Sequence, residues 1–114
     1  MDLESIRKYC LKKPGVTEHF PFDEVTLVFK VEKIFALIST DEFPLRMNLK
    51  FDPEDAVDAR EKYEAVIPGY HMNKKHWNTI ILDGSVPEKV ILKWIDDSYE
   101  LINSSLKKKT RTRK

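Results

Sequence analysis

The stretch from Val25 to Phe51, VTLVFKVEKIFALISTDEFPLRMNLKF, decides the fold class. It contains three runs with strand character, 25–31, 34–39 and 45–51, and the last alternates most cleanly between apolar and polar residues. Only two residues separate the first two runs, and a short polar turn precedes the third. Connections this short join antiparallel neighbours, so we expect an antiparallel sheet.

Helices are predicted on both sides of these strands. Asp2 is a capping residue for a first helix over residues 3–12, whose apolar residues recur at spacings of three and four. Asp52 followed by Pro53 starts a second helix, which runs to about Tyr63. Its acids come early and its bases late, as the helix dipole favours.

The rest of the chain adds one strand and one long helix. A strand is expected over 76–82, and a final helix over 87–105. Ser85 and Glu88 fit a capping box at its start, and the small Ser98 falls on its apolar stripe. The order of helix, strands, helix, strand and helix favours an α+β domain with its helices on one face of the sheet.

The bulk composition is that of one globular domain. The chain has 114 residues, of which 41% are hydrophobic and 34% charged. Its single cysteine, Cys10, excludes an internal disulfide. No window approaches the roughly 18 apolar residues of a membrane span, and the N-terminus lacks the apolar run of a signal peptide. We therefore expect a cytoplasmic monomer that does not contact a membrane.

The net charge of +1 conceals an asymmetry between the body and the C-terminus. Residues 107–114 contain six of the 20 lysines and arginines and no acid. Residues 1–106 then have 14 bases and 19 acids, a net charge of −5. The body is thus mildly acidic and the tail strongly basic, so overall charge does not by itself indicate a nucleic-acid partner.

Patterns typical of metal sites or catalysis are not found in the sequence. The three histidines, His19, His71 and His76, do not have metal-ligand spacing. Cys10 lies on the apolar stripe of the first helix, where cysteine usually acts as a small hydrophobe. The acidic pairs lie in turns or on a helix surface, and the glycines are too far apart for a phosphate loop. We expect no catalytic residue, no metal and no cofactor.

One group of basic and aromatic residues remains as a candidate site for nucleic acid. Polar side chains from the third strand and from the segment before the fourth would combine phosphate contacts with a ring for stacking, if the two adjoin. The alternatives are that Trp77 belongs to the core and that Lys74 and Lys75 form a solvated turn. The candidates are Arg46, Asn48, Lys50, His71, Lys74, Lys75, His76 and Trp77.

A long motif gives the chain a family resemblance. The segment PGYHMNKKHWNT at 68–79, followed by LDGS at 82–85, resembles the signature of the MmcQ/YjbR family. The opening is similar too, with YC at 9–10, PGV at 14–16 and FPF at 20–22. The resemblance covers about residues 1–106.

This resemblance implies a CyaY-like, or secretion-chaperone-like, α+β fold. We expect an antiparallel sheet of about five strands with three helices mainly on one face, formed by residues 1–106, and a disordered basic tail at 107–114. The family is labelled DNA-binding through a proposed double-wing arrangement, which implies DNA as a partner. Two alternatives stay open: a protein-interaction or chaperone-like adaptor, and a small-ligand binder using Tyr70, His71, Asn73 and His76.

Overall fold

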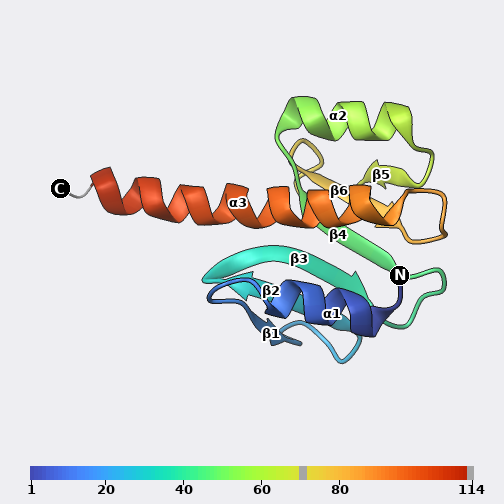
Figure 1. The fold of residues 1–114 in the computed structure, drawn as a ribbon, viewed down its shortest axis with the longest axis horizontal. Coiled ribbons are helices and arrows are strands. Elements are labelled where there is room, and N and C mark those ends of the chain that lie inside the picture. The colour runs from blue at the N-terminus through green and yellow to red at the C-terminus, as the bar shows by residue number, and fades with distance from the viewer. Residues whose placement is uncertain (70–71, 113–114) are drawn as a thin grey trace.

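The computed structural model describes residues 1–69 and 72–112, with side chains through Ser105. These residues form three helices and a six-stranded antiparallel sheet of order β1-β2-β3-β4-β6-β5 (Figure 1). The α+β expectation is confirmed, with six strands where about five were expected. The elements are α1 (Leu3–Leu11), β1 (Thr17–His19), β2 (Thr26–Val31), β3 (Lys33–Ser39), β4 (Arg46–Lys50), α2 (Pro53–Lys62), β5 (Val66–Pro68), β6 (Trp77–Ile81) and α3 (Glu88–Thr112).

A tight hairpin joins β2 and β3, as the sequence predicts. Glu32 turns the chain with a φ of 67°, in the left-handed region, and β3 begins at the next residue. Phe29 pairs with Ala36 whereas Lys30 pairs with Ile34, so Phe35 is an extra residue in β3. Such a bulge leaves the carbonyl of the extra residue without a partner in the ladder.

All three helices contribute to one core on one face of the sheet. Figure 1 shows α1 and α3 crossing the same side of the strands. Phe35 and Tyr99 meet edge to face in this core with ring centroids 5.5 Å apart. The predicted placement of the helices is confirmed. Buried residues of the core include Ile6 and Cys10 of α1, Ala56 and Ala59 of α2, Ile91, Ile95, Tyr99 and Ile102 of α3, and Leu27, Phe29, Ile38, Met47, Leu49 and Ile80 of the strands.

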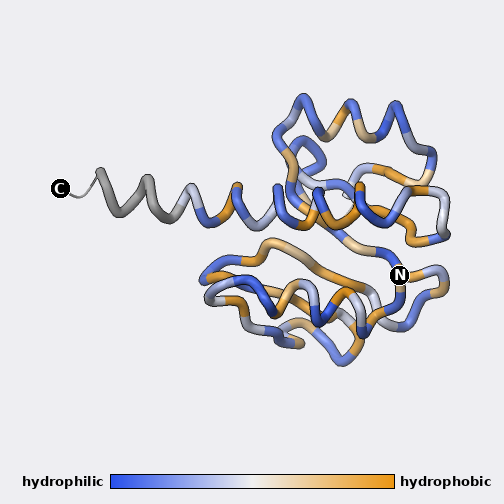
Figure 2. The backbone as a smooth tube through the Cα atoms, in the orientation of Figure 1, coloured by the Kyte–Doolittle hydropathy of each residue, from blue (hydrophilic) through white to orange (hydrophobic). Residues whose placement is uncertain are grey.

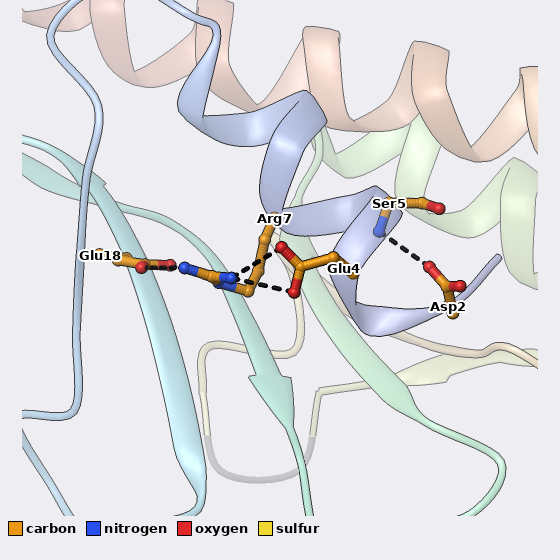
Figure 3. Close-up of polar contacts among 5 residues, drawn as sticks. All are labelled: Asp2, Glu4, Ser5, Arg7 and Glu18. Carbon is orange, nitrogen blue, oxygen red and sulfur yellow. Dashed lines mark hydrogen bonds and ion pairs between the residues drawn. The ribbon is translucent and has the colours of Figure 1, made fainter.

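Polar contacts hold α1 against the edge of the sheet (Figure 3). Asp2 caps the helix as predicted, because its carboxylate accepts a hydrogen bond of 2.8 Å from the Ser5 amide. Arg7 lies between Glu4 and Glu18, and its Nε donates to Glu18 Oε2 at 2.9 Å. This ion pair lowers the pKa of Glu18, since the charged carboxylate is the form that Arg7 stabilises.

One predicted helix start is confirmed without its capping bond, and one predicted cap is wrong. Asp52 is the N-cap residue of α2 and Pro53 its first residue, as predicted, but the Asp52 side chain makes no capping hydrogen bond among the described contacts. Ser85 does not cap α3: its hydroxyl donates to Asp83 at 2.6 Å, and the amide of Ile91 bonds to the carbonyl of Pro87. The turn at 83–85 is therefore closed by Asp83, whose carboxylate also accepts from the Ser85 amide.

The last helix is longer than predicted. We expected it to end at 105, but α3 extends to Thr112. Residues 107–112 of the basic tail are thus part of α3, while the division into a domain of residues 1–106 and a disordered tail stays a prediction. Within the described part of the chain, none of the helices is long and apolar enough to cross a membrane. Figure 2 shows α2 as mostly hydrophilic, with hydrophobic residues concentrated in the strands.

Ser98 connects α3 to the sheet at the bulge. Its side chain is fully buried, and its hydroxyl donates to the carbonyl of Phe35 at 2.6 Å while accepting from the amide of Lys50 at 2.9 Å. The ladder between β3 and β4 ends one residue earlier, at the pair of Ala36 and Leu49. The hydroxyl therefore satisfies two backbone groups that the bulge separates.

Candidate nucleic-acid interface

The face of the sheet away from the helices brings part of the predicted site together. Because β4 and β6 are neighbours, Lys50 lies directly opposite Trp77 and Asn48 opposite Thr79. Paired residues of an antiparallel sheet share a face, and side chains alternate along each strand. We call this side the outer face. Its strand residues include Thr17, His19, Thr26, Val28, Lys30, Ile34, Leu37, Ser39, Arg46, Asn48, Lys50, Ile67, Trp77, Thr79 and Ile81.

The centre of the outer face is apolar and its surroundings are polar. Val28 and Leu37, which pair across β2 and β3, are both buried. Asn48 and Thr79 continue this row of paired residues across β4 and β6, and the Thr79 hydroxyl donates a hydrogen bond to the Asn48 side-chain oxygen. Trp77 is half-buried on this face, outside the core that the helices cover, so the alternative of a core tryptophan does not hold.

The charge of the outer face is positive although the body is acidic. Lys30, Arg46 and Lys50 lie on it, and of the acids only Glu18 falls within the described strands. Glu18 pairs with Phe29 in register and contacts Arg7 of α1, so it belongs to the helix side. The other acids lie in helices and connections, among them four each in α2 and α3. The strands of the outer face therefore carry no acid, although Glu42, in the connection before β4, contacts Arg46.

Lys30 is a member of this face that the sequence-based candidate set omits. The signal was present, since Thr26, Val28 and Lys30 alternate along β2 with Leu27, Phe29 and Val31, which belong to the core under the helices. Including Lys30 in the candidate site required knowledge of the strand order, in which β3 alone separates β2 from β4. Arg46 has an ion-pair partner that the sequence did not predict, because its Nε lies 3.2 Å from a carboxylate oxygen of Glu42. Both partners are about half exposed, so this pair is weak and water-screened.

The Pro68–Thr79 motif shapes the edge of the outer face. The amide of Gly69 donates to the carbonyl of Trp77 at 3.0 Å. A Cβ on Gly69 would lie 3.2 Å from the Trp77 Cβ and 3.3 Å from its carbonyl oxygen. This approach is tighter than ordinary carbon contacts, which explains a glycine here. The motif thus positions the tryptophan that faces Lys50.

Lys74, Lys75 and His76 lie in the turn that leads into β6, not on the strands of the outer face. Asn73 organises the described part of this turn: its side chain accepts from the Lys75 amide at 3.0 Å, and its carbonyl accepts from the amides of His76 and Trp77. Lys74 and Lys75 are exposed, and His76 is half-buried. The carbonyl of His76 accepts from Phe51, which fixes the turn to the end of β4.

Arg60 and Asn78 hold this turn against α2, and neither was predicted to have a role. The Arg60 guanidinium donates to the carbonyl of Lys74 at 3.1 Å and to the side-chain oxygen of Asn78 at 3.0 Å. The fully buried Asn78 also donates to the Ala56 carbonyl at 3.1 Å. A buried amide needs such partners. The available signal was an asparagine within a run that the sequence predicts as a strand.

The remaining candidates for chemistry are described only in part. His71, and Tyr70 of the small-ligand alternative, lie outside the described residues. Burial raises the pKa of the Cys10 thiol to about 12, so it is a neutral core group and not a nucleophile. Over the residues that the structure describes, no cluster of three or more potential ligands could hold a metal ion.

The Asp96–Asp97 pair is structural. Asp96 accepts from the Tyr9 hydroxyl at 2.8 Å and pairs with Lys13, while Asp97 pairs with Lys93 at 3.0 Å. The contacts of Asp96 connect α3 to Tyr9 of α1 and to Lys13 just after it, whereas the Asp97–Lys93 pair lies on the surface of α3. Neither carboxylate is arranged for acid–base work with the other.

Comparison with known proteins gives the family. A family model described as YjbR matches residues 11–101. The uncharacterized protein YjbR of Escherichia coli K12 is 36% identical over 101 residues, 88% of this chain and 86% of that protein. Protein YbdF of Escherichia coli O157:H7 is 34% identical over 96% of this chain and 91% of its own length. The crystal structure of Deinococcus radiodurans DR2400 is similar with a TM-score of 0.85 and 40% identity, covering 88% of this chain and 77% of that one. The chain therefore belongs to the YjbR family.

Proposed function

We propose that this protein is a nucleic-acid-binding module that holds DNA on the outer face of its sheet. The observation that carries the proposal is the register of β4 and β6, which sets Lys50 beside Trp77 and places Arg46 on the same face. Cationic side chains contact phosphates, and an aromatic ring stacks on a base. The two kinds of contact are thus adjacent on one surface.

The charge distribution makes this proposal compatible with an acidic body. Phosphates approach a surface whose described strand residues include Lys30, Arg46 and Lys50 and no acid. The acids of α2 and α3 lie on the other side of the sheet. Exposed charges farther apart than about 8–10 Å are largely screened at physiological salt, so the helix acids repel DNA on the outer face only weakly.

The test is the affinity for a fluorescent 20-nucleotide DNA, single-stranded and duplex, measured by anisotropy as a function of salt. Three to five phosphate contacts from the outer face and the Lys74–Lys75 turn predict a log–log salt slope of about −2.7 to −4.5 for duplex DNA. The double variant Arg46→Gln/Lys50→Gln is expected to reduce this slope by about two and the affinity by about tenfold at low salt.

The matched control is Lys8→Gln/Lys89→Gln, which removes the same charge from exposed positions on α1 and α3. It is expected to leave the slope nearly unchanged. A chain ending at Leu106 separates the body from the basic tail. If this shorter chain does not bind DNA at low salt, or if the control variant weakens binding as much as the outer-face variant, the proposal is wrong and the adaptor alternative gains.

A further inference from the structure

A groove between α2 and α3, on the side of the molecule opposite the outer face, is a second candidate surface. The two helices lie side by side (Figure 1), and the groove between them has a volume of about 840 Å³. Its floor is aromatic. Trp94 meets Phe51 and Tyr63 edge to face, with ring centroids 5.5 and 5.6 Å away, and both Trp94 and Tyr63 are only half-buried.

The walls of this groove are predominantly acidic. Five carboxylates line it, opposed by two lysines, which leaves a net charge of −3. One lysine, Lys93, pairs with Asp97 at 3.0 Å, and the other, Lys62, lies 5.6 Å from the ring centre of Tyr63. An aromatic floor with acidic walls favours a cationic occupant, which gains both ion pairing and cation–π contact. The acids are Asp52, Asp55, Asp58, Asp97 and Glu100.

The same chain supplies a segment of complementary charge. Residues 107–114 contain six bases and no acid. The helical part of this segment, residues 107–112, does not reach its own groove, because α3 lines the groove from Val90 to Ser105 and then extends unbroken to Thr112, leading away from the body (Figure 1). From Ser105 to Thr112 a helix advances about 10 Å. The groove and the basic segment can therefore meet only between molecules.

We propose that the groove between α2 and α3 binds the basic C-terminal segment of a second copy of this chain. Two copies with antiparallel α3 helices crossing at Ser104 would place 107–112 of one beside 96–101 of the other, which includes Asp97 and Glu100. The arrangement is reciprocal, so each copy fills the groove of its partner around a two-fold axis. A salt-sensitive dimer replaces the monomer that the sequence led us to expect.

The test is sedimentation equilibrium of the full chain without DNA, from about 50 to 500 mM salt, over which range screening lengths shorten markedly. The wild type is expected to dimerise at low salt and to dissociate as salt rises. The groove variant Asp55→Asn/Asp58→Asn/Glu100→Gln is expected to dimerise at least about tenfold more weakly. The matched control, Glu54→Gln/Glu61→Gln/Glu88→Gln, removes the same charge from exposed positions of the same helices outside the groove and is expected to dimerise as the wild type does.

A mixing experiment identifies the occupant. The tail variant Lys108→Gln/Lys109→Gln/Arg111→Gln has an intact groove, and the groove variant has an intact tail. Each alone is expected to dimerise at least about tenfold more weakly than the wild type, whereas their mixture is expected to form a heterodimer with one groove filled. The proposal is overturned if the wild type is monomeric at low salt and 100 μM protein, if the control weakens as much as the groove variant, or if the mixture does not associate.

Discussion

Replacing Ser98 by alanine is expected to destabilise the fold by about 2–4 kcal/mol, although the change removes a single oxygen atom. The hydroxyl bonds both the Phe35 carbonyl and the Lys50 amide inside a fully buried site. Alanine would leave both backbone groups unpaired, and each unpaired buried group costs about 1–3 kcal/mol. Partial relaxation of the bulge keeps the expected total below the sum of the upper limits.

The assay is chemical and thermal unfolding followed by circular dichroism. At about 4 °C per kcal/mol for a domain of this size, the melting temperature of Ser98→Ala should fall by about 8–16 °C. Ser104→Ala is the matched control, since Ser104 is exposed on the same helix and its replacement should change stability by less than about 0.5 kcal/mol. A loss below about 1 kcal/mol for Ser98→Ala would refute the bridging role of the hydroxyl.

Three further predictions concern other parts of the fold. Gly69→Ala should cost about 1–3 kcal/mol in an unfolding experiment, because the new Cβ would press on the Trp77 backbone; an unchanged midpoint would show that the turn yields freely. Glu18→Gln should lower stability at pH 7 by less than about 1 kcal/mol, since the pair with Arg7 is partly exposed. Arg7 lowers the pKa of Glu18, so this stabilisation is present above the ordinary value of 4.5 and is lost as pH falls below it; the variant and wild-type stability curves should converge in acid, and parallel curves would contradict this. Cys10, whose pKa burial raises to about 12, should react with a thiol reagent at pH 8 only as fast as the protein opens, and labelling at the rate of a free thiol would contradict its burial.

The sequence predicts the main elements because their signals are local. Residues 25–31 and 45–51 alternate as half-buried strands do, and 34–39 is a short apolar run with strand character; the structure has β2, β3 and β4 in these places. In contrast, β1 and β5 have three residues each, which is too few for a period to be visible. The capping role of Ser85 failed because Asp83 competes for its hydroxyl within the same turn.

The candidate site is less predictable because it depends on strand order and register. Arg46, Asn48 and Lys50 share a face by alternation alone, but their position next to Trp77 follows from the pairing of β4 with β6 across the intervening helix. Lys30 joins this face only through the strand order β2-β3-β4, and Lys74 and Lys75 lie in the turn before β6 begins at Trp77. Long-range partners such as Arg60 and Asn78 leave almost no local signal.

The outer face as the DNA-binding surface is tested most directly by a titration of the isotope-labelled full chain with a single-stranded 20-nucleotide DNA, followed by amide chemical shifts. We expect the largest changes at Asn48, Lys50 and Trp77, with smaller changes at Lys30 and Arg46. The amides of α2 should stay nearly constant. Shifts confined to α2, α3 and the basic tail, with β4 and β6 unaffected at saturating DNA, would contradict the proposal.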